Sequence, residues 1–130
     1  MEVREVMTAD VVSIPPELTL QDAASIMKTL DVAALPVSDG ERLIGVITDR
    51  DITLRAIAEG RDPRTTDVGD VMTAEVVCCH EDDEVQRAAL LMQREQLRRL
   101  MVVDAGGRLV GIVSLGDVKR ESREEERVQR

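Results

Sequence analysis

The chain has 130 residues, 43% of them apolar and 33% charged, a balance that suits one compact domain or two small packed halves. Its formal net charge of −9 argues against a nucleic-acid partner and against an anionic membrane surface, because both are bound through Lys and Arg. No aromatic residue occurs, so we expect an aliphatic core, and a planar ligand would have to lie between aliphatic side chains.

The lack of a recognisable targeting signal and the cysteine usage predict a cytoplasmic protein. The opening "MEVREVMTAD" lacks the apolar region of a signal peptide, and no apolar run approaches the roughly 18 residues of a membrane helix. The two cysteines, Cys78 and Cys79, are adjacent, and adjacent cysteines seldom pair with each other. We therefore expect a reduced, cytoplasmic protein with no nucleic-acid partner and no membrane partner.

The sequence is a tandem duplication. The segment "VMTADVV" at Val6–Val12 returns as "VMTAEVV" at Val71–Val77, identical at six of seven positions. Later segments keep this offset of 65 until one residue is inserted near Gly106–Gly107, after which "RLIGVITDRDI" aligns with "RLVGIVSLGDV". We divide the chain into a first repeat (1–60), a linker (61–70), a second repeat (71–118) and a polar charged tail (119–130).

Each copy is predicted to begin with a strand and a helix. The strand covers Val11–Ile14 in the first copy and Val76–Cys79 in the second. The residue before each helix, Thr19 or Glu84, suits a helix start, Thr as a cap and Glu at the positive end of the dipole. Apolar residues at the spacing of one buried helix face are Leu20, Ala23, Ala24 and Met27, repeated by Val85, Ala88, Ala89 and Met92.

Two strands and a second helix complete each copy. The strands are predicted at Leu35–Ser38 and Leu43–Ile47, and again at Leu100–Val103 and Leu109–Val113. In the first copy the helix that follows ends at Gly60, a residue suited to a C-cap. Because neither copy buries enough apolar surface alone, we predict an α+β fold of two β-α-β-β-α repeats that pack through their sheets with pseudo-two-fold symmetry.

A short motif ends the last strand of each copy. It reads "GVITDRD" at Gly45–Asp51 and "GIVSLGD" at Gly111–Asp117. The spacing of Thr48 and Asp51 before a helix is that of a capping box. A helix amino terminus also attracts anions, and an aspartate directed at a cleft accepts two hydrogen bonds from a vicinal diol such as ribose. The motif therefore fits a helix cap, a ligand site or both.

These landmarks together resemble a tandem pair of CBS domains, often called a Bateman module. The resemblance covers about residues 4–118 and rests on the "VMT" starts, the paired alanines of the helix stripe, the "LPV" strand and the final aspartate. The runs "TDRDITLRAIAEGRDP" and "RRLMVV" are similar to small stand-alone bacterial CBS-pair proteins, including the hypoxic response protein group. The resemblance implies a homodimer of two modules and a ligand that contains adenosine.

The resemblance also implies two ligand sites, each with a ribose held by the last aspartate of the motif. The motif hydroxyl would lie near ribose or phosphate, and the threonine of each "VMT" start resembles a donor from the neighbouring repeat. Adenine would lie between the first strand and the "LPV"-type strand. The implied ribose and phosphate residues are Thr48, Asp51, Ser114, Asp117, Thr8 and Thr73. The implied adenine-pocket residues are Val11, Val12, Leu35, Pro36, Val37, Val76, Val77, Leu100, Met101 and Val102.

The two implied sites differ in charge. Family members that bind AMP or ATP commonly carry a basic pair before the "LPV" strand, reaching phosphates in the opposite copy's site. The second copy has Arg98–Arg99 there, whereas the first has Ala33–Ala34. We predict that the Thr48/Asp51 site, facing these arginines, accepts phosphate, while the other site prefers a less anionic adenosyl ligand or stays empty. The alternative is that both arginines form surface ion pairs with the many acids.

No catalytic or metal-binding arrangement stands out. In "CCH" at Cys78–His80, consecutive residues of a strand point to opposite faces, and no C-x-x-C or H-x-x-x-H spacing is present. The chain has one His and no nucleophile–base pair or Walker loop, so we predict neither a metal site nor an enzyme.

We expect a regulatory, ligand-sensing module that needs no cofactor. The adenosyl ligand would be AMP, ADP, ATP, NAD or S-adenosylmethionine, bound in the clefts between the repeats. A conformational or dimer rearrangement would signal to an unidentified protein effector. The alternative is a ligand-free interaction or scaffold protein, or a regulatory subunit of a separate enzyme.

Overall fold

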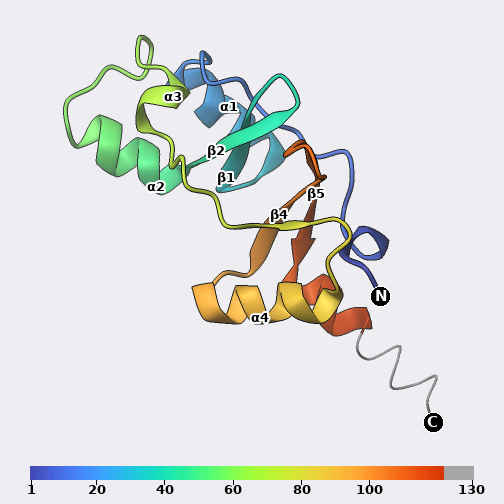
Figure 1. The fold of residues 1–130 in the computed structure, drawn as a ribbon. Coiled ribbons are helices and arrows are strands. Elements are labelled where there is room, and N and C mark those ends of the chain that lie inside the picture. Colours follow the sequence, from blue (N-terminus) through green and yellow to red (C-terminus); the bar gives the residue numbers. More distant parts are fainter. Residues whose placement is uncertain (122–130) are drawn as a thin grey trace. The chain divides into compact units, whose positions relative to one another are not determined.

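The computed structural model describes residues 1–121, which form two compact units (Figure 1). The first-copy unit is Val12–Val76, and the second-copy unit combines Met1–Val11 with the chain from Val77 onward. Each unit thus joins the body of one sequence copy to the opening segment of the other, so the compact units and the sequence repeats have different boundaries. Most of the predicted polar tail, residues 122–130, lies outside the described part.

The first-copy unit holds a two-stranded antiparallel sheet and short helices. Thr19 caps α1 as predicted, because its hydroxyl accepts the amide N–H of Asp22 at 3.2 Å. Strands β1 and β2 pair along their length, with a bulge between Val37 and Ser38. The elements are α1 (Leu20–Leu30), β1 (Ala34–Asp39), β2 (Arg42–Thr48), α2 (Asp49–Asp51), the π-helix η2 (Ile52–Ile57) and α3 (Val68–Val71).

The second-copy unit holds a three-stranded sheet in the order β3-β4-β5, with α4 packed against it (Figure 1). Strand β3 runs parallel to β4, and β4 runs antiparallel to β5. The chain continues from β5 into a helix at residues 115–121. The other elements are η1 (Val3–Glu5), β3 (Cys78–His80), α4 (Val85–Glu95), β4 (Arg99–Val103) and β5 (Leu109–Ser114).

Each unit has its own aliphatic core, as the composition predicts. In the first-copy unit the core is built from α1, β1, β2, η2 and α3, and in the second-copy unit from η1, α4 and the sheet. The predicted helix stripes are buried, except that Ala24 is exposed and Ala89 is half-buried. The predicted α+β class and the tandem repeat are confirmed by this arrangement of elements.

The predicted first strand at Val11–Ile14 is wrong for most of its length. Only Ile14 pairs, as a single parallel bridge to Val37. Pro15 follows directly and has no N–H to extend a ladder, and Val12 is 48% exposed, so no alternating face is buried. In the second copy the strand begins two residues later and ends one residue later than predicted, at Cys78–His80.

The second helix of the first copy is not a regular α-helix. A three-residue α2 widens at once into η2, in which Ala58 N–H donates to the carbonyl of Thr53 at 2.9 Å. Helix η2 ends at Ile57, before the predicted stop at Gly60, and residues 58–60 form a turn. Gly60 has φ +77°, and the following Arg61 N–H donates to the carbonyl of Ala56 at 2.9 Å.

Gln96 offers a test of how the first helix of each copy ends. It follows α4 with φ +56°, as Asp31 follows α1 with φ +55°. This region costs an ordinary L-residue roughly 1–2 kcal/mol, whereas glycine avoids that cost and loses roughly 0.5–1 kcal/mol through its freer unfolded chain. We expect Gln96→Gly to raise the free energy of unfolding in urea by about 0.5–1 kcal/mol. Asp31→Gly is the control with a smaller gain, since aspartate tolerates this conformation; a loss of stability in Gln96→Gly would contradict the interpretation.

Candidate functional site

Both motifs form complete capping boxes. The Thr48 hydroxyl accepts the amide N–H of Asp51 at 3.0 Å, and Asp51 Oδ2 accepts the amide N–H of Thr48 at 3.0 Å. In the second copy the Ser114 hydroxyl accepts from the Asp117 amide at 3.1 Å, and Asp117 Oδ2 accepts from the Ser114 amide at 2.9 Å. The helix-cap interpretation is therefore confirmed at both sites.

Each box leaves one carboxylate oxygen outside its hydrogen bonds. Asp51 Oδ1 lies 3.8 Å from Arg55 Nε, and Asp117 Oδ1 lies 3.9 Å from Arg120 Nη2. Both separations are too long for hydrogen bonds, so these oxygens keep acceptor capacity. The two aspartate side chains are 11% and 19% exposed, so solvent still reaches them. A carboxylate oxygen with this capacity is able to accept a hydrogen bond from a small donor such as a hydroxyl group.

The opening segment of each copy pairs with the last strand of the other. Thr73 and Val46 exchange both backbone hydrogen bonds at 2.9 Å. In the second-copy unit Thr8 and Ile112 do the same at 2.8 and 2.9 Å. Each "VMT" threonine therefore lies beside the strand that leads, two residues later, into the other copy's box.

This crossing explains why each motif starts with glycine. A Cβ added to Gly45 would lie 2.6 Å from Met72 Sδ and 2.9 Å from the carbonyl oxygen of Thr73. A Cβ on Gly111 would meet Met7 Sδ at 2.7 Å and the carbonyl oxygen of Thr8 at 2.8 Å. This constraint was not predicted from the sequence, although the Met-Thr that recurs in both "VMT" starts is the signal that indicates it.

The structure groups the implied polar site residues by unit. The first-copy unit brings together Thr48, Asp51 and Thr73. The second-copy unit brings together Ser114, Asp117 and Thr8, as well as Arg98 and Arg99.

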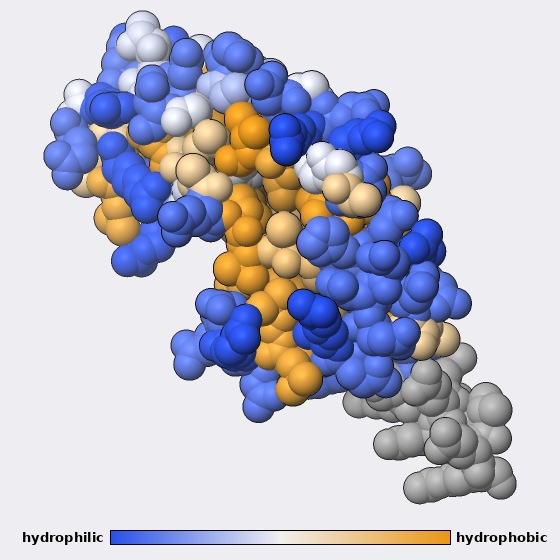
Figure 2. Space-filling model, viewed as in Figure 1, coloured by the Kyte–Doolittle hydropathy of each residue, from blue (hydrophilic) through white to orange (hydrophobic). Residues whose placement is uncertain are grey.

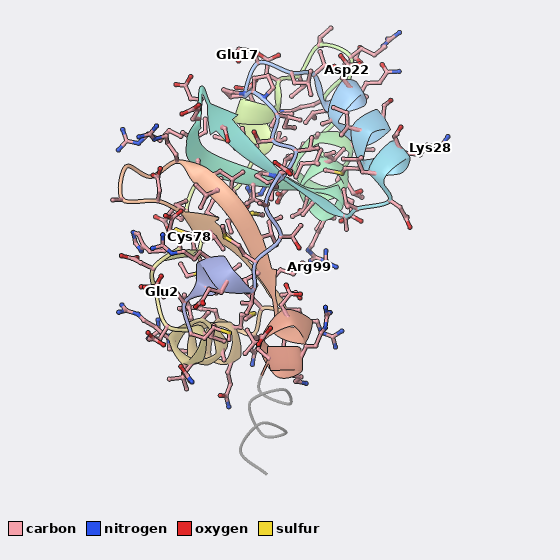
Figure 3. The ribbon with its side chains drawn as sticks, turned by 90° about the vertical axis from the view of Figure 1, so that its right-hand side faces the viewer. Glu2, Glu17, Asp22, Lys28, Cys78 and Arg99 are labelled. Atoms are coloured by element: carbon pink, nitrogen blue, oxygen red, sulfur yellow. The ribbon has the colours of Figure 1, made fainter. Side chains whose placement is uncertain are left out.

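Arg98 and Arg99 lie at the start of β4, beside the second box. The Leu115 amide donates to the carbonyl of Arg98 at 2.8 Å, and Arg99 stands opposite Ser114 in the strand pairing (Figure 3). Both residues are exposed, and within residues 1–121 neither guanidinium forms an ion pair. The expectation that these arginines serve a phosphate stays a prediction.

The implied adenine residues divide into buried and accessible sets. Leu35, Val37, Leu100 and Val102 are at most 2% exposed and belong to the two cores, and Pro36 is also buried. Those side chains hold the sheets together. The accessible members are Val11, Val12, Val76, Val77 and Met101. A ligand contact stays a prediction for all ten.

The "CCH" segment forms β3. Burial raises the pKa of the Cys78 thiol, and burial raises that of Cys79 to about 11, so both thiols are neutral near pH 7. The exposed His80 lies with its Nδ1 4.0 Å from Asp83 Oδ2. Over residues 1–121, no group of three or more His, Cys, Asp or Glu side chains is placed to hold a metal ion. Within the same residues no helix is both long enough and apolar enough to cross a membrane.

Comparison with protein families and curated proteins gives consistent matches. The family model described as "CBS domain" matches twice, at residues 3–57 and 68–124. The CBS domain-containing protein YhcV of Bacillus subtilis is 45% identical over 116 residues, covering 89% of this chain and 81% of that protein. Hypoxic response protein 1 of Mycobacterium tuberculosis is 36% identical over 118 residues, covering 90% and 82%.

Solved structures with the same fold include ligand complexes. Hypoxic Response Protein I with two coordinated zinc ions has a TM-score of 0.81 at 35% identity, covering 92% of this chain and 98% of that one. CBSX2 in complex with AMP has a TM-score of 0.79 at 29% identity, covering 96% and 98%. The CBS domain pair of MJ0100 with 5-methylthioadenosine and S-adenosyl-L-methionine has a TM-score of 0.76 at 27% identity, covering 96% and 98%.

The crossing at Gly45 predicts a large effect of a single methyl group. Gly45→Ala places Cβ against Met72 Sδ and a backbone carbonyl that cannot rotate away, so we expect a loss of about 1–3 kcal/mol in the free energy of unfolding. Gly116→Ala is the control. A Cβ added there would lie 3.6 Å from its nearest neighbour, Ser114 Oγ, and Gly116 is in a helix, where alanine is favourable. Equal stability of Gly45→Ala and the wild type in urea denaturation would show that the segments do not cross so closely.

Proposed function

The chain belongs to the CBS domain family, and on that basis we propose that it is a regulatory module that senses an adenosine-containing ligand at its two capping boxes. The observation that carries the proposal is the aspartate that ends each motif. Its Oδ2 accepts the amide N–H of Thr48 or Ser114 at the helix start, and its Oδ1 remains able to accept a further hydrogen bond. Its ribose-binding role is a proposal about this chain. We assign the module no catalytic step.

The adenosyl class is supported by two kinds of observation. A vicinal diol offers two hydroxyl donors, and the carboxylate oxygen left outside each box is an acceptor. Similar structures hold AMP in one case and 5-methylthioadenosine with S-adenosyl-L-methionine in another. AMP, ADP, ATP, NAD and S-adenosylmethionine are therefore the first ligands to test.

An apolar surface around α4 supports the homodimer in the proposal. Leu90 on α4 is 66% exposed and Leu97 is 38% exposed, and Figure 2 shows apolar side chains gathered over the α4 part of the surface. A groove beside these residues is lined by Ala89, Met92, Leu97, Leu115 and Val118, among others. Exposed patches of this kind mark interaction surfaces, so we propose that two copies associate here and that an effector protein responds to the ligand state.

Thermal shift with site variants tests the ligand proposal. A ligand at 100 times its Kd stabilises the folded state by about 2.7 kcal/mol, so at least one of the five ligands should raise Tm in proportion to its concentration. Asp51→Asn keeps an oxygen for the Thr48 amide and loses the charge, and hydrogen bonds to charged groups contribute about 1.5–3 kcal/mol. We expect roughly 10- to 100-fold weaker binding at the first site, and the same for Asp117→Asn at the second.

Asp49→Asn is the matched control for this experiment. It changes an exposed aspartate two residues away, whose side chain accepts the amide N–H of its neighbour Arg50 at 2.8 Å. Its ligand response should equal that of the wild type. If no ligand shifts Tm in the wild type, the protein is a scaffold whose boxes serve only as caps.

The arginine pair gives a separate prediction about phosphate. We propose that Arg98 and Arg99 supply the positive charge that binds the phosphate of an adenine nucleotide. Replacing both by alanine should weaken AMP by about tenfold or more and leave adenosine unchanged, because each charged hydrogen bond contributes about 1.5–3 kcal/mol. Isothermal titration with both compounds measures this. Arg94→Ala, at a 75% exposed position on α4, is the control, and an equal AMP affinity in the double variant would remove the assignment.

A further inference from the structure

Arg55 joins the first box to the opening segment of the second copy. Its Nη1 donates to the carbonyl oxygens of Val71 at 3.2 Å and of Met72 at 3.3 Å. Its Nε lies 3.8 Å from the free oxygen Oδ1 of Asp51. One guanidinium therefore faces both the box and the segment that carries Thr73.

The two carbonyls are natural partners for a guanidinium. Helix α3 spans only Val68–Val71, and Met72 is its C-cap. The last carbonyls of a helix have no partner within the helix, and an arginine near that end satisfies them and complements the dipole. Met72 also packs its sulfur over Gly45, and Thr73 pairs with Val46. Arg55 thus fastens the residues directly before the crossing.

Arg55 lies within the π-helix η2. Wide turns of this kind are rare and recur at functional sites, where they redirect a side chain. The i to i−5 hydrogen bond from the Ala58 amide to the carbonyl of Thr53, at 2.9 Å, spans position 55, and a second one, from Arg61 to Ala56 at 2.9 Å, follows directly after it. The departure from α-helix therefore falls on the turn that carries the bridging side chain.

The second copy lacks this connection. The residue aligned with Arg55 is Glu121, whose ionised carboxylate accepts hydrogen bonds and donates none. Asp117 instead faces Arg120, and among the described residues no side chain donates to the carbonyls of Val6 or Met7. The two boxes share backbone geometry and differ in which contacts hold the opening segment beside them.

We propose that Arg55 is a positioning residue of the first site, which holds Asp51 and the Thr73 segment in one arrangement for the ribose of the ligand. The inference rests on the proposed ligand function and adds a residue that neither the capping box nor the family pattern singles out. At the second site the opening segment is held in another way, by backbone hydrogen bonds from the Val3 amide to the carbonyl of Asp83 and from the Arg4 amide to the carbonyl of Glu81.

Hydrogen exchange of the ligand-free protein tests the fastening directly. In Arg55→Gln the amides of Thr73 and Val46 should exchange about tenfold faster, as measured by NMR. This factor is at the low end for hydrogen bonds from a charged group, because the Arg55 side chain is 53% exposed and solvent screens it. Exchange of the Thr8 and Ile112 amides should stay unchanged. Arg55→Lys should give an intermediate rate, since an ammonium group keeps the charge but not the fork. Unchanged exchange at Thr73 and Val46 in Arg55→Gln would overturn the inference.

Titration with AMP and adenosine tests the positioning role. The measurements use an Asp117→Asn background, in which ligand binding is measured at the first box. Arg120→Gln, in the second copy, is the matched control. We expect Arg55→Gln to weaken both compounds by about tenfold, because positioning acts on the ribose that they share. A loss for AMP alone would mean a phosphate contact and would overturn the positioning role.

The two proposals fail in distinguishable ways. If the Asp117→Asn protein binds AMP and adenosine through Asp51 and Arg55→Gln binds them equally well, the positioning role is wrong and the ligand function stands. If neither compound binds, or binding does not depend on Asp51, the ligand function itself fails, and the positioning role fails with it.

Discussion

The backbone pairing between each opening segment and the other copy's last strand is the constraint on which the rest of the structure depends. Thr73 with Val46 and Thr8 with Ile112 each exchange two hydrogen bonds, and both pairs lie directly before a capping box. The pairing brings a backbone over Gly45 and Gly111 at distances that no side chain tolerates. It also means that neither copy completes its own unit, because each borrows the opening segment of its duplicate.

The capping box turns a local helix start into a chemically useful carboxylate. A free aspartate on a surface would rotate among several rotamers, and ordering it would cost entropy when a ligand binds. Here Oδ2 is held by the amide of Thr48 or Ser114, so the direction of Oδ1 is set before any ligand arrives. Cap and proposed ligand group are the same side chain, and the first function prepares the second.

Sequence patterns were most informative where the signal is periodic or local. The stripes of α1 and α4, the hairpins and both boxes follow from spacing within a few residues, and the structure confirms them. The prediction of a first strand at Val11–Ile14 was wrong for most of its length. β-Branched residues favour a strand there, but Pro15 lacks the backbone N–H that would continue the pairing.

Features that depend on residues far apart in the chain were not predicted. The role of Gly45 depends on Met72 and Thr73, and Arg55 depends on two carbonyls 16 and 17 residues away. A carbonyl has no residue-type signature, so no motif could point to those contacts. The repeat itself contained part of the missing information, since the same glycine and the same Met-Thr recur at matching positions in both copies.

Duplication explains why the two boxes share a skeleton and differ in their side chains. Backbone pairing constrains glycine and the box residues in both copies, because a change there alters the crossing itself. Positions outside the pairing carry no such requirement, and there the copies have diverged: Arg98–Arg99 against Ala33–Ala34, and Arg55 against Glu121. These positions surround the same kind of carboxylate with different charges. On the proposed function, one fold thus offers two adenosyl sites of unequal anion preference, and unequal sites let one module respond to the ratio of two ligands rather than to the amount of one.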